Sequence, residues 1–314
     1  MRYSLSVIIL VALSAPASHA TAADAMDTSR IEQLTGAKGQ MNEKEGVFKV
    51  SVPRTDLRVT TAGVKMTPPL GLTSWAAFKQ VGNDTVVMGD NVLLEDQVNA
   101  VVDAALQNGL EVTALHNHFF WDQPKVMFMH VGGMGDTEKL AAAIGKVFAA
   151  IKATGGTGGG DGPSVPTADI DSAKTKLNTQ QIDQAFGAKG ETAPNGVHKV
   201  TIAKTTKMHG HEMGSAMGVN TWAAFAGTDE RAVVDGDFAM YENELQAVLK
   251  SLRGSGINIV AIHNHMTMEE PRVIFLHYWG VGPAQDLAKG VKAALDAQGK
   301  AGRGSGNAGS AAHN

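Results

Sequence analysis

Three histidines occur twice in this chain at the same spacing, and imidazole is both the commonest metal-binding side chain and a general base. The first set is His116, His118 and His130. The second set is His263, His265 and His277, each 147 residues after its counterpart. A doubled His-x-His with a distal histidine predicts one metal site in each half of the chain. The alternative is that these are core histidines whose ring nitrogens only satisfy hydrogen bonds.

The register of the hairpin decides whether three histidines can share one ion. His116 and His118 would point to the same face of a strand, because side chains alternate. A turn of three residues at 122–124 would place His116 opposite His130, with His118 as a diagonal neighbour at about 7 Å. A longer loop at 119–124 would instead move His130 out of reach. We favour the first register, in which all three rings converge.

Two further histidines, His209 and His211, lie in the segment KMHGHEMGSAMG of the second half. Imidazole combined with methionine thioether suits copper, so both histidines are candidate metal ligands. The aligned segment of the first half, VKMTPPLG, has no histidine. The second site is therefore expected to be richer in ligands and the more active, unless this segment is only a Gly-rich loop.

Three acidic residues of the second half are candidate general bases for catalysis: Asp237, Glu269 and Glu270. Asp237 and its counterpart Asp90 each follow a glycine, so they could also bind the metal, orient a histidine or occupy a turn. Glu269 and Glu270 directly precede a proline, and they could instead solvate the hairpin turn.

The chain contains no cysteine, so a metal would be held by histidine, carboxylate, amide or methionine. We expect a divalent ion, with zinc, copper and iron as the candidates. Three histidines leave a coordination position open, where a bound water reaches a pKa of about 7 and becomes a nucleophile. Metal-dependent hydrolysis is therefore one expectation, although the chain has neither H-E-x-x-H nor G-x-S-x-G.

Two other classes of function fit the same pattern of residues. A non-catalytic protein that buffers or senses copper or zinc would use the same ligands. A small-molecule binding module would use the histidines as hydrogen-bond partners and would hold no metal. Metal analysis of the purified protein, followed by an activity screen, separates these classes from a metal-dependent enzyme.

Composition narrows the choice of partners. The net charge is −4 in 314 residues, and 43% of the residues are hydrophobic, which is typical of a globular protein. A negative net charge argues against nucleic acid as a partner, because phosphate binding requires a basic surface. We expect the ligand to be a metal or a small molecule.

The N-terminus resembles a secretory signal peptide. Arg2 supplies its positive charge, residues 5–13 form its short apolar region, and Ser18-His19-Ala20 fits the cleavage site. So short an apolar segment cannot span a bilayer of about 30 Å, and no other segment is apolar enough to do so. We expect a periplasmic or secreted protein with no integral membrane segment once residues 1–20 are removed.

Further matches extend the duplication along the chain. The tetrapeptide GAKG at 36–39 recurs at 187–190, and Trp75 corresponds to Trp222, both of which we expect to be core anchors. A Gly-rich segment separates the two halves and is typical of a flexible linker. The predicted organisation is a pair of repeat domains at 24–152 and 168–298. A linker at 153–167 separates them, and a disordered tail follows at 299–314.

Both halves show the same order of predicted elements. Alternating apolar residues predict strands, as at 47–54, and apolar residues at helical spacing predict a helix that ends at Asn108-Gly109. Two strands that carry the histidines follow, and then an amphipathic helix. This order, strand–helix–strand–strand–helix with extra N-terminal strands, predicts an α+β fold in which each repeat is a largely antiparallel sheet with helices packed on it.

The segments LEVTALHNH…PKVMFMHVGGMGD and INIVAIHNHM…EEPRVIFLHYWG, with twin WAAF and GD motifs, resemble the LppY/LpqO family of exported bacterial proteins. The resemblance covers nearly the whole chain after the signal peptide. It implies a tandem repeat and export, but no particular reaction, because that family has no settled activity. Its namesakes are lipoproteins, whereas this chain lacks a lipobox cysteine, so membrane anchoring is not implied.

Overall fold

The fold is given by a computed structural model that describes residues 26–155 and 168–306. The expected signal peptide at 1–20, the linker residues 156–167 and the last residues of the chain, 307–314, lie outside the described residues. In the described part of the chain, no helix combines the length and the apolar composition needed to cross a membrane.

The first repeat contributes six strands to the main sheet and three helices that pack on it. Its main elements are α1 (Thr28–Thr35), β1 (Gly39–Asn42), β2 (Val47–Pro53), β5 (Thr73–Val81), β6 (Asp84–Leu94), α2 (Val98–Gln107), β7 (Glu111–His116), β9 (Val126–Gly135) and α3 (Thr137–Ala153). A small separate sheet is formed by β3 (Thr60–Thr61), β4 (Val64–Lys65) and β8 (Asp122–Gln123).

The second repeat has the same elements in the same order. They are α4 (Thr179–Phe186), β10 (Glu191–Thr192), β11 (His198–Ala203), β14 (Asn220–Gly227), β15 (Ala232–Tyr241), α5 (Leu245–Gly254), β16 (Asn258–His263), β18 (Val273–Gly282) and α6 (Ala284–Gly306). Its small sheet is formed by β12 (Thr206–Met208), β13 (His211–Met213) and β17 (Glu269–Glu270). The predicted α+β fold with two similar repeats is confirmed.

The helices form where the sequence places apolar residues at helical spacing. In α2, the buried residues Val98, Val101, Val102 and Ala105 recur every three or four positions and form one apolar face. The helix stops before Gly109, which has a φ of +81° and so provides the left-handed residue that commonly follows a helix. The expected helix and its end are thus seen in the structure.

The strands of the two repeats form one continuous sheet, which the sequence did not predict. Its order is β1-β2-β5-β6-β9-β7-β16-β18-β15-β14-β11-β10, and every neighbouring pair is antiparallel. The repeats meet at its centre, where Leu115 of β7 pairs with Ile262 of β16. Beneath this joint, Arg253 of α5 makes a bidentate ion pair with Asp103 of α2 at 2.7 and 2.8 Å.

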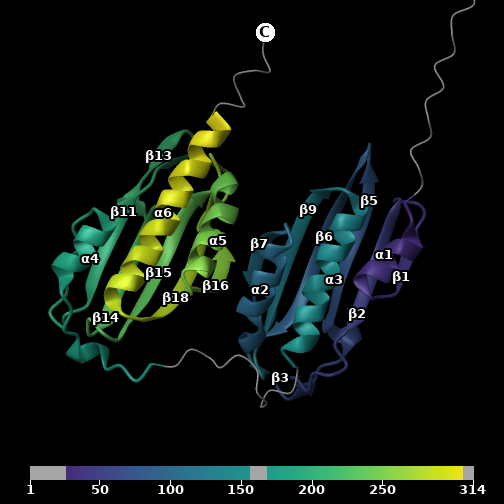
Figure 1. The fold of residues 1–314 in the computed structure, drawn as a ribbon, viewed down its shortest axis with the longest axis horizontal. Coiled ribbons are helices and arrows are strands. Elements are labelled where there is room, and N and C mark those ends of the chain that lie inside the picture. The colour runs from purple at the N-terminus through teal and green to yellow at the C-terminus, as the bar shows by residue number, and fades with distance from the viewer. Residues whose placement is uncertain (1–25, 156–167, 307–314) are drawn as a thin grey trace, which may run out of the picture.

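All six α-helices lie on one face of the sheet, toward the viewer in Figure 1. One hydrophobic core lies between helices and sheet and includes residues of both repeats, among them Leu115, Met129, Ile262 and Leu276. We call the opposite side the open face, and it bears the side chains that alternate with these core residues along the same strands. Every histidine of the two repeated sets is on the open face.

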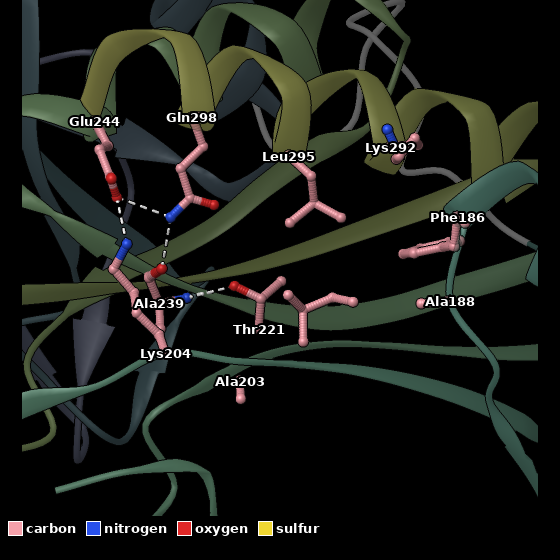
Figure 2. A pocket seen from close by; sticks show the side chains of 13 residues that line it. Phe186, Ala188, Ala203, Lys204, Thr221, Ala239, Glu244, Lys292, Leu295 and Gln298 are labelled. Carbon is pink, nitrogen blue, oxygen red and sulfur yellow. Dashed lines mark hydrogen bonds and ion pairs between the residues drawn. The ribbon is translucent and has the colours of Figure 1, made fainter. Parts of the chain in front are cut away.

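A cavity of about 370 Å³ lies beneath α6 in the second repeat (Figure 2). Its wall contains a nearly buried ion pair between Lys204 Nζ and Glu244 Oε2 at 2.8 Å. Gln298 of α6 donates a hydrogen bond from Nε2 to the same carboxylate oxygen, and another to the carbonyl oxygen of Ala239. Three polar side chains of the wall, Lys204, Glu244 and Gln298, therefore bind one another.

The structure corrects two of the predictions for the helices and the C-terminal tail. Helix α6 continues to Gly306, so the predicted disordered tail does not begin at 299. The short helices α1 and α4 were not predicted at all, although each has a side-chain N-cap, Asp27 and Asn178 respectively, and is followed by a left-handed glycine. Eight residues carry too few apolar positions for a helical period to stand out.

Candidate metal centres

A row of three residues crosses neighbouring strands of the open face in each repeat. In the first repeat, Trp75 of β5 lies opposite Asp90 of β6, and Asp90 lies opposite His130 of β9. The second repeat has the same row, formed by Trp222, Asp237 and His277. Directly opposed residues in antiparallel strands point to the same side, so each carboxylate lies between an indole and an imidazole.

This row overturns two expectations. Asp90 and Asp237 are in the middle of strands and not in turns. Trp75 and Trp222 are not core anchors: they are half-buried on the open face, where Lys49 and Lys199 respectively place their ammonium groups over the indole rings. Their neighbours Ala76 and Ala223 point into the core instead.

The histidine strands pair in a register that differs from both alternatives considered for the sequence. His130 lies opposite Ala114, and His116 lies opposite Phe128. An irregularity between Val112 and Ala114 shifts the pairing within β7, and the same shift recurs between residues 259 and 261 of β16. A β-bulge of this kind adds a residue to one strand, and no pattern in the sequence predicted it.

The three histidines of the first repeat nevertheless converge. The Nε2 atoms of His116 and His130 are 3.1 Å apart and share a hydrogen bond; the distance is also close to the roughly 3.3 Å expected for two nitrogens of a tetrahedral zinc site. His118 lies beyond the end of β7 and stacks on Phe128, with 3.3 Å between ring centroids. Its ring centroid is 5.2 Å from that of His116, so the three rings lie side by side. Among the described residues, the group of three converging ligand atoms is the one in the second repeat.

The second repeat contains the equivalent cluster with a closer carboxylate. Asp237, His263 and His265 each offer one ligand atom, and these atoms all lie within 4.8 Å of one another. The distance from Asp237 Oδ2 to His265 Nε2 is 3.4 Å, and His265 stacks on Phe275 with 3.4 Å between centroids. The ring centroid of His277 is 4.8 Å from that of His263, so the third histidine stacks beside the group but does not belong to it.

Hydrogen bonds orient these ligands. The backbone amide of Leu276 donates to Asp237 Oδ1 at 3.1 Å, which leaves Oδ2 directed at the histidines. His277 Nδ1 lies 3.3 Å from the carbonyl oxygen of Gly236, and His116 Nδ1 lies 3.2 Å from that of Asn117. Because a carbonyl only accepts, Nδ1 carries the proton in both rings and Nε2 keeps its lone pair for a metal.

Burial moves three titratable groups of the clusters, His118, His265 and Asp237, toward their neutral forms. It lowers the pKa of His118 and of His265, and the nearby carboxylates, Asp90 and Asp237, offset this only in part. Burial likewise raises the pKa of Asp237, against the opposing effect of the histidines. Neutral imidazole is the form that binds a metal, and a divalent cation would restore the charged form of the carboxyl.

Two buried polar atoms at the clusters have no hydrogen-bond partner in the protein: Nε2 of His263 and Oδ1 of Asp90. An unpaired buried nitrogen or carboxylate oxygen costs free energy, on the order of 1–3 kcal/mol. A metal ion bound between the side chains would supply the missing partner for both atoms. The donor set of histidine and carboxylate therefore fits a divalent transition metal.

Neither Glu269 nor Glu270 lies at the cluster, contrary to their assignment as general-base candidates. Glu269 is buried, and its Oε1 accepts a hydrogen bond from the amide of Val273 at 3.2 Å. Asp122 does the same for Val126 in the first repeat, at 2.6 Å. Glu270 is exposed on β17, which belongs to the small sheet. Both carboxylates are part of the hairpin that follows the cluster.

His209 and His211 were predicted to be metal ligands, and the structure places both at the exposed turn between β12 and β13. His209 has a φ of +51°, typical of a tight turn. Within the described residues, neither belongs to the ligand group formed by Asp237, His263 and His265. His209 and Gly210 form the turn, and His211 is the first residue of β13, so HGH is the tip of an exposed β-hairpin.

Sequence reasoning missed one carboxylate and two aromatic rings. Asp235 lies two residues before Asp237 on β15, opposite Trp279, and burial raises its pKa against the opposing effect of His277. The repeat Asp-Gly-Asp in a strand was the available signal, because residues two apart share a face. The stacking rings, Phe128 and Phe275, each precede the distal histidine by two residues, and the same rule would have placed them beside it.

Comparison with known families shows to which family the chain belongs. A family model described as a domain of unknown function (DUF1259) matches residues 29–150 and, a second time, residues 180–297. The chain belongs to this family. The two DUF1259 matches coincide with the two repeats, and each contains one histidine cluster.

No match is found among curated proteins. Among solved structures, a trimeric bacterial microcompartment shell protein, PduB, is similar at 13% identity, over 83% of this chain and 90% of that chain. The TM-score of that comparison is 0.18, so it supports no conclusion about the DUF1259 chain.

Proposed function

We propose that this DUF1259 protein is an exported metal-binding protein that holds one divalent ion in the histidine cluster of each repeat. The observation that carries the proposal is the convergence of ligand atoms: 3.1 Å between His116 Nε2 and His130 Nε2 in one repeat, and three ligand atoms within 4.8 Å in the other. Export rests on the signal-like N-terminus and on the resemblance of the sequence to exported proteins.

The donor set favours zinc, copper or iron over magnesium or calcium. Imidazole nitrogens outnumber carboxylate oxygens in both clusters, and the hard cations prefer oxygen. The side chain of His265 is 36% exposed and that of His130 is 34% exposed, so each cluster is reached from the open face. A site that opens to solvent keeps room for water or a small-molecule ligand.

Metal-dependent hydrolysis is the narrower form of this proposal. Its support is the open coordination position together with Asp237, the one predicted general-base candidate that lies at a cluster. Glu269 and Glu270 do not contribute, since both belong to the hairpin. Buffering or sensing of copper or zinc requires the same clusters and no base, and so it is the competing function.

The test is the metal content of the purified full chain, measured by mass spectrometry, before and after stripping and reloading. We expect two equivalents of metal in the unaltered protein and about one in each of His118→Ala and His265→Ala. The matched control is His211→Ala, which removes an exposed histidine outside the clusters and should keep both equivalents.

The outcomes separate the functions. Loss of metal only in the cluster variants supports the proposal, and an activity screen of loaded and stripped protein then distinguishes hydrolysis from buffering. Two equivalents retained in a His263→Ala/His265→Ala/His277→Ala variant would rule out the second site. A protein that binds no metal at all would leave a small-molecule binding module as the function.

A further inference from the structure

We propose that the two metal centres act as one composite site for an extended ligand that carries an anionic oxygen group, such as a carboxylate, near each end. This inference rests on the proposed function, because each anionic group would bind the metal of one repeat. It goes beyond that function by assigning the class of ligand and by making both repeats necessary for tight binding.

The two centres face the same side of one sheet. Leu115 and Ile262 pair at the joint of the repeats, and both point into the helix-covered core. Their neighbours His116 and His263 therefore both point to the open face, one on each central strand. A ligand lying on that face meets both centres without having to pass through the protein.

Strand order sets the separation of the centres. His116 and His130 are on β7 and β9, His263 and His277 are on β16 and β18, and β7 is next to β16. The midpoints of these strand pairs are two spacings apart, about 10 Å at roughly 4.8 Å per spacing. A shift of up to two residues along the strands brings the separation to about 10–12 Å.

The cross-strand partners of the two distal histidines, on the central strands, are small. Ala114 of β7 is the cross-strand partner of His130, and Ala261 of β16 is the partner of His277. Both alanines point to the open face and are half-buried there. Because each carries a single methyl group, the surface between the histidine clusters is low enough for a ligand chain to cross.

The separation is a fixed property of the fold. The bidentate pair between Arg253 and Asp103 joins α2 to α5 beneath the central strands. Asn99 also donates from Nδ2 to the carbonyl oxygen of Ile259 at 3.2 Å and accepts from its amide at 2.7 Å. The two clusters are therefore held in place before a ligand arrives, and a matching ligand binds without a cost for arranging them.

A ligand that reaches both metals gains affinity from the second attachment. Once one end is bound, the other end is at an effective concentration in the millimolar range, which raises the overall affinity by about 10²–10⁴ when the geometry matches. The gain vanishes if the ligand is too short to span the sites. The length of the ligand is therefore the variable that tests the proposal.

The experiment uses the metal-loaded full chain and straight-chain α,ω-dicarboxylates of increasing length, each compared with the monocarboxylate of equal length by calorimetry. We expect equal affinities for short chains and a gain of about tenfold or more once the chain spans about 10–12 Å, with one ligand bound per protein. The gain should be absent in His118→Ala and in His265→Ala and unchanged in His211→Ala, with metal content measured in every sample.

Three results would overturn the composite site. A flat length profile in protein that holds two metals would do so and leave the proposed function intact. The same gain in affinity in both His118→Ala and His265→Ala would show that dicarboxylates bind elsewhere. Two ligands per protein at every length would show that the centres act independently. Absence of metal from the unaltered protein is a different failure, because it removes the proposed function itself.

Discussion

Asn99 and Gln246 hold equivalent positions in the two repeats, and each hydrogen-bonds the backbone of the other repeat. The side-chain amide of Asn99 hydrogen-bonds the backbone N–H and carbonyl of Ile259. The side-chain amide of Gln246 likewise binds the carbonyl and the N–H of Val112, at 2.9 and 3.1 Å. Val112 and Ile259 are the residues at which β7 and β16 depart from regular pairing. Each repeat thus supplies the hydrogen bonds that the irregular strand of the other one lacks.

We expect Asn99→Ala to destabilise the protein by about 1–3 kcal/mol, because it leaves the amide and the carbonyl of Ile259 without partners. The free energy of unfolding in urea measures the effect. Asn108→Ala is the matched control: its amide is exposed and bonds only the carbonyl of Ala104, so the change should stay within about 0.5 kcal/mol. Equal losses of unfolding free energy in Asn99→Ala and Asn108→Ala would contradict the stabilising role of the hydrogen bonds at the joint.

Asp237→Asn is expected to weaken metal binding in the second repeat by roughly tenfold or more, since it removes the carboxylate of the converging ligand group. It should also stabilise the metal-free protein at neutral pH. Burial raises the pKa of Asp237, so its ionised form opposes folding as the pH rises through that pKa. Asparagine keeps an acceptor for the amide of Leu276 and carries no charge.

Metal titration and thermal unfolding of the stripped protein measure the two effects of Asp237→Asn. Asp235→Asn is the control, because Asp235 is on the same strand and also has a raised pKa but lies outside the group of converging ligand atoms. Asp235→Asn should lower metal affinity less than Asp237→Asn does. A stripped Asp237→Asn protein that unfolds more easily than the unaltered one would contradict the argument.

The duplication of the sequence could predict the clusters but not their geometry. His116, His118 and His130 were found from spacing alone, because a strand puts alternate residues on one face. The pairing of His130 with Ala114 was missed, since it depends on an irregularity that leaves no mark in the apolar pattern. Asp237 was one of several candidates because glycine and aspartate are also typical turn residues.

The sequence could not predict that the two repeats join in one sheet, for a different reason. Each half has a complete set of strands and helices, so two separate domains were a sufficient interpretation. The link depends on the edge strands β7 and β16, whose backbone groups pair with each other. Edge pairing is made by backbone atoms, and its side-chain signature is confined to the residues that cross between the repeats beneath it, Arg253 with Asp103, Asn99 and Gln246.

Metal release is expected only in moderately acidic solution. Burial lowers the pKa of His118 and His265 below the ordinary value of about 6.5, so both rings stay neutral where a free imidazole is half protonated. A lowered histidine pKa means that proton competition begins only as the pH falls further. Metal affinity measured between pH 7.5 and 5 should be nearly constant at first and then fall. A loss that begins above pH 7 would contradict the assignment of these rings as ligands.

Position 244 shows how the two repeats differ beneath the sheet. In the first repeat the equivalent residue is Gln97, whose Oε1 accepts from the amide of Leu94 at 3.0 Å. The cation of that repeat, Arg54, is neutralised by Asp56 at 2.8 Å. In the second repeat Glu244 itself neutralises Lys204, so one residue both caps the following helix and balances the charge.

Glu244→Gln therefore copies the first repeat at this position but leaves Lys204 nearly buried without a counter-charge (Figure 2). We expect it to destabilise the protein by about 3 kcal/mol, as removal of one partner of a buried ion pair does. The double variant Lys204→Met/Glu244→Gln should recover most of that loss, because no charge then remains buried. Denaturant unfolding of both variants measures this. The exposed pair of Lys292 and Asp296 is the control, and Lys292→Met should cost less than about 1 kcal/mol. A double variant as unstable as Glu244→Gln would show that the loss arises from packing against α6 and not from the unpaired charge.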